Sequence, residues 1–522
     1  MTLAAALVVV ATGTGELPQF TESRVAVGAE PFEYQLSDVD LDLRVDLMVA
    51  SVAGGERTLR LWRQRADASF ASTPDWSLAV PPDVTSWSLL DLRPEPGREL
   101  VLLTRGGVHS LTTTRAGLKD NLRREFAAPL FPDLADPRRL PCWRLTQDVD
   151  GDGRDELLLV VEEELRIFAV ATDAAVAAAG SALVELGRLP VTPRAARVSE
   201  RGSFTFGSSG MRGSGPGGGA SFFRSARTSR PGIFGEKLLD RRRTLDLPRL
   251  LDFGGDAALE RVESEDGHWR VSPLPLPGAP APAPARFELP EAARDASTTE
   301  WTDLDGDGTR ELVVFRSDDD DKVALAFTAR ADPAQPLGAL FDATPTARIK
   351  LDGMGVQYWL TDVDHDGRQD LTARVFDVPT GVSTLATVRL DTAFHVFRGR
   401  PGATWSRAPD LSFERSFRPE QLTRVQESLL INVGGDFDGD GCNDLVTTQL
   451  DGRVEIRRIT TGERLELEAK PIVSFAPPAE VERLETWDLS RDGVADLTLR
   501  HEQALTLFVS RGTPRPLPEG RR

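Results

Sequence analysis

An acidic loop pattern, D-x-D-x-D-G-x-x-[D/E] followed by an apolar residue, recurs along the chain and limits its fold more than any other feature. We number the copies loop 1 to loop 8; they begin at Asp38, Asp91, Asp148, Asp252, Asp303, Asp362, Asp436 and Asp488. Loops 3, 5, 6 and 7 are complete, and loops 2 and 4 are eroded. Loop 8 has Ser490 in place of one carboxylate, and loop 1 has Leu43 in place of the glycine. Most copies start 51 to 59 residues apart, a spacing that indicates a propeller or a repeat array.

Each loop lies between short extended segments. An apolar segment leads into the loop (298–304, for example), a second leaves it at once (311–315), and two further extended pieces precede the next copy. Four strands in series form a blade, and radial closure protects the sheet edges that an open array would expose. We therefore predict an all-β chain that forms a single β-propeller of four-stranded blades over residues 16–512.

The number of loops favours eight blades. Seven blades remain possible if loop 2 or loop 4 lies outside the ring. The last repeat supplies only three strands, so we expect residues 17–27 to add the fourth strand and to close the ring.

The loop pattern suits a calcium ion, which takes six to eight oxygen ligands. Carboxylates stand at positions 1, 3, 5 and 9, position 7 offers a backbone carbonyl, and glycine at position 6 permits a sharp turn around the ion. The complete loops supply the candidate ligands Asp148, Asp150, Asp152, Arg154, Glu156, Asp303, Asp305, Asp307, Thr309, Glu311, Asp362, Asp364, Asp366, Arg368, Asp370, Asp436, Asp438, Asp440, Cys442 and Asp444. Loops 8 and 1 add Asp488, Ser490, Asp492, Val494, Asp496, Asp38, Asp40, Asp42, Arg44 and Asp46.

We expect Ca²⁺ in the four complete loops and in six at most. Loops 2 and 4 are expected to hold no ion, because Arg93 and Gly254 stand at ligand positions. The alternative is that the loops are acidic turns that cap hairpins without an ion.

The charge balance disfavours a nucleic-acid partner. The chain has 62 Lys and Arg against 81 Asp and Glu, a formal net charge of −19. Much of this acidity lies in the loops, where bound calcium would offset it. No apolar run is long enough for a transmembrane span, and we expect a monomer.

The first residues resemble a secretion signal. Residues 1–15 contain an apolar run of the length of a signal-peptide core, although no Lys or Arg precedes Arg24. We expect a signal peptide or its remnant, and export to the periplasm, the cell envelope or the outside of the cell. A buried first strand is the alternative. The two cysteines, Cys142 and Cys442, are expected to be unpaired.

The loops and their flanking segments resemble those of the FG-GAP or VCBS repeat proteins, whose propeller is like that of integrin α-subunits. The resemblance covers roughly residues 17–510. It implies calcium loops on one face of the ring and ligand contacts commonly on the opposite face. It implies no single activity, because members include adhesion modules, lectins and the scaffolds of some polysaccharide lyases.

Several features lie outside the loops. Residues 201–235 are rich in Gly and Ser and are expected to be a flexible insertion, 272–285 a Pro/Ala-rich linker, and 513–522 a disordered tail. Asp318 to Asp321 are expected at a hairpin tip. Five tryptophans precede loops, and we expect core packing in place of sugar stacking for them: Trp87, Trp143, Trp301, Trp359 and Trp487.

Catalysis has little support in the sequence. We predict no catalytic residues, because the five histidines form no spaced metal pair and no nucleophile or phosphate-loop motif is present. We therefore expect an exported, calcium-binding, non-enzymatic interaction or adhesion module for a protein or a glycan. The alternatives are a polysaccharide-active, lyase-like enzyme and a purely structural component of the cell envelope.

Overall fold

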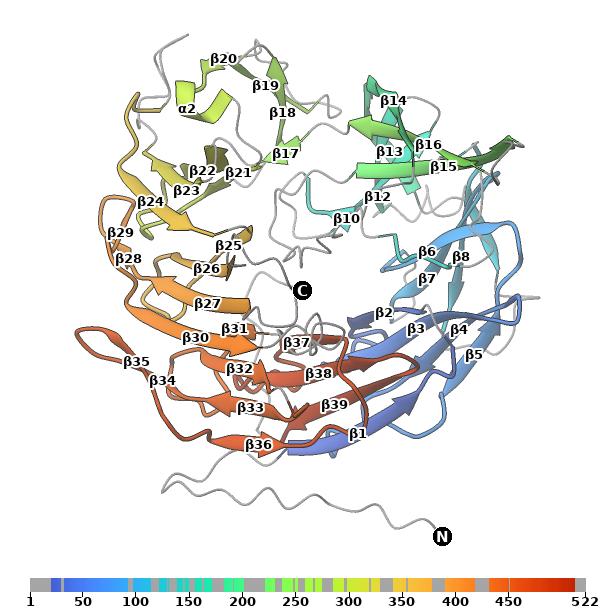
Figure 1. The fold of residues 1–522 in the computed structure, drawn as a ribbon. Coiled ribbons are helices and arrows are strands. Elements are labelled where there is room, and N and C mark those ends of the chain that lie inside the picture. The colour runs from blue at the N-terminus through green and yellow to red at the C-terminus, as the bar shows by residue number, and fades with distance from the viewer. Residues whose placement is uncertain are drawn as a thin grey trace.

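A computed structural model shows a ring of antiparallel sheets (Figure 1). The structure describes residues 20–29, 32–92, 97–113, 122–128, 130, 139–143, 146–149, 155–161, 164–170, 183–190, 192–200, 221–230, 237–246, 249–251, 259–265, 268–274, 285–294, 298–318, 321–328, 341–353, 355–377, 390–417, 431–449 and 451–511. Eight four-stranded sheets follow one another around the ring, which confirms a single all-β propeller of eight blades. The seven-bladed alternative is wrong, because loops 2 and 4 both lie within blades.

The blades are numbered as their loops. Blade 1 consists of β2 (Phe32–Ser37), β3 (Asp46–Ala53), β4 (Glu56–Trp62) and β5 (Trp76–Ala79), and blade 2 of β6 (Val84–Leu90), β7 (Glu99–Thr104), β8 (Gly107–Thr112) and β9 (Arg123–Phe126). Blade 3 consists of β10 (Thr146–Gln147), β11 (Glu156–Val161), β12 (Glu164–Val170) and β13 (Leu183–Pro190), and blade 4 of β17 (Arg249–Leu251), β18 (Glu260–Glu265), β19 (His268–Pro273) and β20 (Ala285–Glu288).

The second half of the ring repeats this order. Blade 5 consists of β21 (Thr298–Thr302), β22 (Glu311–Asp318), β23 (Asp321–Phe327) and β24 (Ala347–Asp352), and blade 6 of β25 (Gly355–Thr361), β26 (Asp370–Asp377), β27 (Leu390–Phe397) and β30 (Leu411–Phe417). Blade 7 consists of β31 (Ile431–Gly435), β32 (Asp444–Thr448), β33 (Val454–Arg457) and β36 (Val473–Phe475), and blade 8 of β37 (Arg483–Trp487), β38 (Asp496–His501), β39 (Ala504–Ser510) and β1 (Phe20–Ala26).

The chain closes the ring with its first described strand. Strand β1 pairs with β39 over seven residues, from Phe20 opposite Ser510 to Ala26 opposite Ala504. Figure 1 shows the blue β1 beside the red β39. The expected contribution of residues 17–27 is thus confirmed for Phe20–Ala26.

Shorter elements interrupt the regular order. A three-stranded sheet of β14 (Thr192–Glu200), β15 (Ser221–Arg230) and β16 (Lys237–Asp246) occupies the long interval between loops 3 and 4. Within the interval 201–235 the structure describes β15 alone, and 1–15 and 513–522 lie outside the described residues. Two hairpins follow later, β28 (Gly399–Arg400) with β29 (Thr404–Trp405), and β34 (Ile459–Thr461) with β35 (Leu465–Leu467).

Helical structure is confined to one short turn in the described chain, α2 (Glu291–Arg294). Among the described helices, none has the length and apolar character needed to cross a membrane. Asp318 pairs with Asp321 at the end of the β22–β23 hairpin, as expected. Neither cysteine forms a disulfide with another described residue, and Cys442 is buried.

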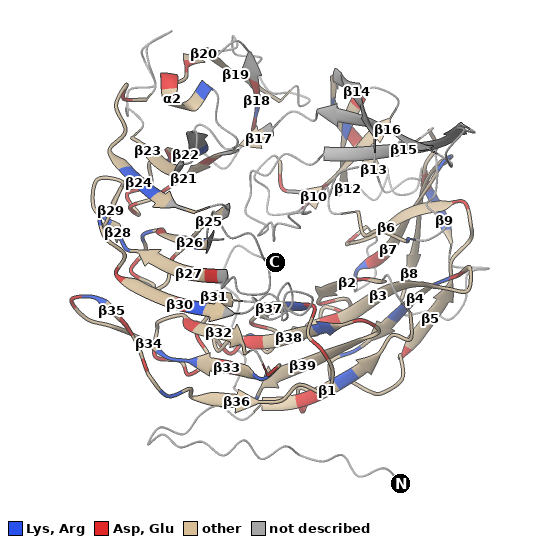
Figure 2. Ribbon diagram, in the orientation of Figure 1, with Lys and Arg blue, Asp and Glu red and all other residues tan. Residues whose placement is uncertain are grey.

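Apolar packing joins each blade to the next. Eight clusters of buried residues lie at the eight interfaces, including the one between blades 8 and 1, where Val25 and Leu507 meet Phe32 and Leu47. Inner strands such as β6, β7, β11 and β39 are buried along their whole length, so successive side chains of each sheet pack against both of its neighbours. Figure 2 shows basic and acidic residues distributed over many blades in place of a single charged patch.

The tryptophans before the loops divide into two groups. Trp87, Trp143 and Trp301 are buried in these clusters, and Trp359 is partly buried against one of them, as core packing predicts. Trp487 differs, because 44% of it is exposed.

The closing strand can be tested with one buried side chain. Val25 in β1 is fully buried, whereas its neighbour Ala26 is exposed. We expect Val25→Asp to lower the free energy of unfolding by about 3–5 kcal/mol, because it buries an unpaired charge. The matched variant Ala26→Asp should change it by less than about 0.5 kcal/mol. Urea denaturation measures both values, and equal effects would contradict the role of β1 in sealing the ring.

Candidate metal sites on the loop face

The eight loops lie on one face of the ring. In every blade the first strand ends directly before position 1 of the loop, and the second strand begins at position 9. Because all blades share the same antiparallel order, their loops emerge on the same side. We call this side the loop face; the turns between second and third strands form the opposite face.

Two left-handed residues turn the backbone of each described loop. Positions 4 and 6 have positive φ at Leu41 and Leu43, Gly306 and Gly308, His365 and Gly367, Gly439 and Gly441, and Arg491 and Gly493. A side chain in this conformation costs about 1–2 kcal/mol. Leu43 has a φ of 71°, so loop 1 keeps the turn in spite of lacking the glycine.

The carboxylate of position 1 closes this turn. One of its oxygens accepts a hydrogen bond from the backbone N–H of position 6, at 2.9 to 3.0 Å, in loops 1, 5, 6, 7 and 8. The residue pairs, acceptor first, are Asp38 and Leu43, Asp303 and Gly308, Asp362 and Gly367, Asp436 and Gly441, and Asp488 and Gly493.

The carboxylate of position 9 anchors the start of the loop. It accepts the N–H of position 2 in seven blades, with distances from 2.5 to 3.0 Å. The acceptors, all at most 2% exposed, are Asp46, Glu99, Glu156, Glu311, Asp370, Asp444 and Asp496. Even the eroded loop 2 keeps this bond, from Leu92 to Glu99. Position 9 is therefore structural with or without an ion.

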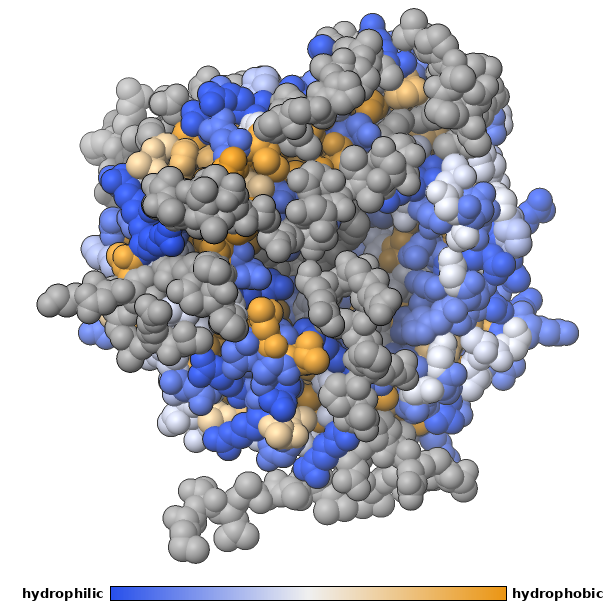
Figure 3. Space-filling view, turned by 180° about the vertical axis from the view of Figure 1, so that it is seen from behind, coloured by the Kyte–Doolittle hydropathy of each residue, from blue (hydrophilic) through white to orange (hydrophobic). Residues whose placement is uncertain are grey.

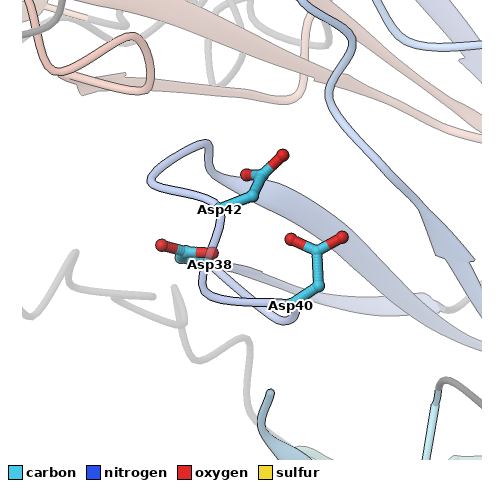
Figure 4. A group of neighbouring side chains, drawn as sticks. All are labelled: Asp38, Asp40 and Asp42. Carbon is cyan, nitrogen blue, oxygen red and sulfur yellow. The ribbon is translucent and has the colours of Figure 1, made fainter. Parts of the chain in front are cut away.

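Three loops gather the carboxylates of positions 1, 3 and 9. In each, one oxygen from each residue lies within 4.8 Å of the other two: Asp303, Asp305 and Glu311 in loop 5; Asp362, Asp364 and Asp370 in loop 6; Asp436, Asp438 and Asp444 in loop 7. In loop 1 the group consists of positions 1, 3 and 5, which are Asp38, Asp40 and Asp42 (Figure 4).

Each of the three complete clusters contains a buried carboxylate oxygen that makes no hydrogen bond within the described chain. These atoms are Asp305 Oδ1, Asp364 Oδ1 and Asp444 Oδ1, and in the loop 1 cluster Asp38 Oδ1 and Asp40 Oδ1 also lack a hydrogen-bond partner among the described residues. Buried polar atoms are normally hydrogen-bonded, so each needs an explanation. Clustered oxygen donors with one free oxygen fit a hard cation such as Ca²⁺.

The electrostatics of these clusters also favours a bound cation. Burial, together with the neighbouring carboxylates, raises the pKa of Asp444 to about 8 and those of Glu311 and Asp370 to about 7. A buried group that is costly to ionise beside other carboxylates is stabilised by a bound cation.

Position 3 has protein partners that the sequence analysis missed. Asp364 pairs with Arg398 and Asp438 with Arg458, and both arginines directly follow the third strand of their blade. Asp305 instead accepts the N–H groups of Gly402 and Ala403, from the β28–β29 hairpin of the next blade. A basic residue directly after the third strand is the signal that would have indicated the first two pairs.

Adjacent loops are also joined to each other. The N–H of position 8 donates to the carbonyl of position 2 in the preceding loop, as in Gln369 to Leu304 (2.9 Å) and Asn443 to Val363 (2.7 Å). The same bond joins loops 2 and 1 and loops 4 and 3. In loop 8 Ala495 donates to position 1 of loop 7, at 2.7 Å from the carbonyl of Asp436. Loops 5 to 8 therefore form a continuous hydrogen-bonded belt along the loop face, and loops 1 and 2 and loops 3 and 4 form joined pairs.

The predicted ligands at position 5 and those of loops 8 and 3 lie outside the clusters of loops 5, 6 and 7. In the described loops the carboxylate of position 5 accepts the N–H of position 7, through the pairs Asp42 and Arg44, Asp307 and Thr309, Asp366 and Arg368, Asp440 and Cys442, and Asp492 and Val494. Loop 8 does not form a carboxylate cluster among the described residues. Loop 3 is described only at Asp148, Val149 and from Asp155 onward, so Asp150, Asp152 and Arg154 lie outside the described residues.

Comparisons with known proteins identify no family for the chain. No model of a known protein family matches the chain, and no curated protein matches it. One similar solved structure is an Agrocybe aegerita lectin that recognises non-reducing terminal N-acetylglucosamine, at 12% identity and a TM-score of 0.34, covering 92% of this chain and 86% of that one. Another is the Photorhabdus luminescens Tc holotoxin pore, at 12% identity and a TM-score of 0.30, covering 93% of this chain and 23% of that one. These values support no argument about function.

The pKa shifts predict how the stability of the metal-free protein depends on pH. Carboxylates with raised pKa values keep more protons in the folded than in the unfolded state, so stability should fall as the pH rises from about 4 to about 8. We expect Asp444→Asn to reduce this fall, because the amide does not ionise. Melting temperatures of metal-stripped protein at about pH 5.5 and about pH 8 measure the effect.

The comparison between the variant and the unmodified chain isolates this contribution. Burial lowers the pKa of His109, His395 and His501, so these histidines cost stability as the pH falls and act in the opposite direction. An identical pH dependence in both proteins would show that Asp444 is not the buried, poorly ionised group described above.

Proposed function

We propose that the chain is a calcium-braced β-propeller of the FG-GAP or VCBS type that acts, outside the cytoplasm, as a non-enzymatic interaction module for a protein or a glycan. The observation that carries the calcium part is the buried, unpartnered carboxylate oxygen in each of the clusters of loops 5, 6 and 7. Asp303, Asp305 and Glu311 would hold the ion in loop 5, and the equivalent residues would hold it in loops 6 and 7.

The role of calcium in this proposal is stability. An ion that binds only the folded chain stabilises it by mass action, by about 1.4–2.7 kcal/mol per site at millimolar Ca²⁺ and a Kd of about 10–100 µM. Millimolar calcium is available outside the cell, which agrees with export. Three such sites on a continuous belt of loops would brace blades 5, 6 and 7 as a unit.

The interaction part of the proposal is supported by where apolar side chains are exposed. Among the described residues the large exposed apolar ones are Leu41, Leu43, Leu122 and Trp487, at 44% to 51% exposure. Leu41 and Leu43 lie in loop 1, and Trp487 directly precedes loop 8. Leu122 lies between a third and a fourth strand, so strand direction places all four on the loop face. Figure 3 shows apolar residues among hydrophilic ones on the surface seen from behind.

Leu41 and Leu43 are the residues of most interest. Both occupy left-handed backbone that disfavours a leucine side chain, and backbone strain is often found at functional sites. We therefore place the partner surface on the loop face at blades 8 and 1, whereas the family resemblance implies the opposite face.

Calcium stoichiometry tests the metal sites directly. Asp438→Ala and Asp305→Ala should each remove one ion per chain, together with about 1.4–2.7 kcal/mol of calcium-dependent stabilisation. The matched control is Asp451→Ala, which removes an exposed aspartate from the opposite face of blade 7. Isothermal titration and melting curves with and without a chelator give both quantities. Unchanged stoichiometry in the loop variants would refute the sites.

Partner binding is tested by a screen against glycans, envelope polymers and candidate proteins, in calcium and after its removal. The double variant Leu41→Asn, Leu43→Asn should retain the fold, because Asn tolerates left-handed backbone, and should weaken binding at least ~10-fold. Glu56→Asn, on the opposite face of blade 1, serves as the control. A ligand that binds the double variant as tightly as the unmodified chain would exclude this surface.

A further inference from the structure

Loop 1 differs from loops 5, 6 and 7 in the partner of its position 1 carboxylate, whereas its position 3 and position 5 pairs have counterparts in loop 6, Asp364 with Arg398 and Asp366 with Arg368. Each of its three clustered aspartates pairs with an arginine: Asp38 with Arg491 at 3.3 Å, Asp40 with Arg63 at 3.1 Å, and Asp42 with Arg44. Figure 4 shows the three carboxylates around the loop. At position 1 of loops 5, 6 and 7 the described chain provides no arginine partner, and the carboxylates of Asp303, Asp362 and Asp436 accept backbone N–H groups.

Arg491 reaches loop 1 from the other end of the chain. It occupies position 4 of loop 8, and its guanidinium crosses the seam between the last and the first blade. Its side chain is 23% exposed and that of Asp38 is 6% exposed, so the pair is largely shielded from solvent.

Position 4 faces the next loop elsewhere in the ring as well. In loop 6, His365 Nε2 lies 3.1 Å from Asn443 Oδ1 of loop 7. In loop 5, a Cβ atom added to Gly306 would lie 2.6 Å from the carbonyl oxygen of Gly367 in loop 6. The backbone of the loop therefore directs a side chain at position 4 toward the neighbouring loop, and in loop 8 that side chain carries a positive charge.

Loop 8 has satisfied its own polar groups without a carboxylate at position 3. Ser490 Oγ lies 2.8 Å from Ser510 Oγ, which also donates to Asp492 Oδ2 at 2.6 Å. The backbone N–H of Ser510 donates to Asp496 Oδ1 at 2.6 Å. These contacts hold the loop that presents Arg491.

We propose that Arg491 is the resident cation of loop 1 and stands there in place of calcium, so that the ring closes without a metal ion. The inference rests on the proposed calcium sites of loops 5, 6 and 7. In loops 6 and 7 an arginine pairs with the position 3 carboxylate and position 1 has only backbone N–H partners in the described chain, whereas in loop 1 Arg491 occupies an oxygen of the position 1 carboxylate and repels a divalent cation there. Because it is covalently attached, it is present at any calcium concentration.

Other contacts at the seam are also independent of calcium. The Tyr34 hydroxyl donates to Glu485 across the interface, and the Arg500 guanidinium lies 4.4 Å from the centre of the Phe32 ring. Together with the β1–β39 pairing, they hold blade 8 against blade 1. Among the loops that the structure describes in full, the metal-dependent part of the ring is thus the arc of blades 5, 6 and 7.

The test removes the positive charge of Arg491 and measures the number of calcium ions bound per chain. Arg491→Gln in the full chain should bind one calcium ion more than the unmodified protein in an isothermal titration with CaCl₂, and Arg491→Gln, Asp38→Asn should lose that ion again. Arg464→Gln removes an exposed arginine from the β34–β35 turn and should leave the stoichiometry unchanged. No added ion in Arg491→Gln would overturn the inference.

Hydrogen exchange on the unmodified chain gives a second measurement that needs no variant. On removal of calcium, exchange should accelerate in loops 5, 6 and 7 and stay slow in loop 1, β1 and β39. Acceleration at the seam together with loops 5 to 7 would overturn the inference while leaving the calcium sites intact. A protein that binds no calcium at all would refute the proposed function and this inference with it.

Discussion

The buried carboxylate at the start of each second strand is the interaction on which the rest of the structure depends. It accepts the N–H of position 2 in seven blades, including blade 2, whose loop has Arg93 in place of the position 3 carboxylate. This bond fixes the path of the loop, and the loop then donates from position 8 to the previous blade. These loop hydrogen bonds therefore link neighbouring blades, in addition to the apolar clusters at each interface.

The same position 9 carboxylate is unfavourable to ionise where it lies. Its burial beside the acids of positions 1 and 3 makes ionisation costly, and these acidic loops need a counter-charge. Within the described chain, the clusters of loops 1, 5, 6 and 7 all retain a buried oxygen without a hydrogen-bond partner, but among these four only loop 1 has an arginine, Arg491, on its position 1 carboxylate. One repeat unit therefore supports two kinds of charge balance, and the residue at position 4 of the preceding loop decides between them at the seam.

Much of the fold was predictable because its pattern is local and repeated. The spacing of the loops gave eight four-stranded blades, and the three strands of the last repeat indicated closure by the N-terminal segment. The clusters of loops 5 to 7 contain predicted ligands because positions 1, 3 and 9 are fixed by the turn itself.

The rest depends on contacts between distant residues. Arg491 and Asp38 lie 453 positions apart, and no pattern within one repeat connects them. The exposure of Trp487 could not be read from its place before a loop, since the four equivalent tryptophans pack into or against the core. Loop 1 keeps its turn without glycine, which the motif does not indicate because Leu43 adopts a left-handed backbone that usually favours glycine.

The most direct test of the account is diffraction from crystals grown in calcium, recorded at a long wavelength where calcium scatters anomalously. Anomalous peaks are expected among Asp303, Asp305 and Glu311 and at the equivalent positions of loops 6 and 7, and no peak is expected beside Asp38. Ordered loops 5, 6 and 7 without an anomalous peak would contradict it.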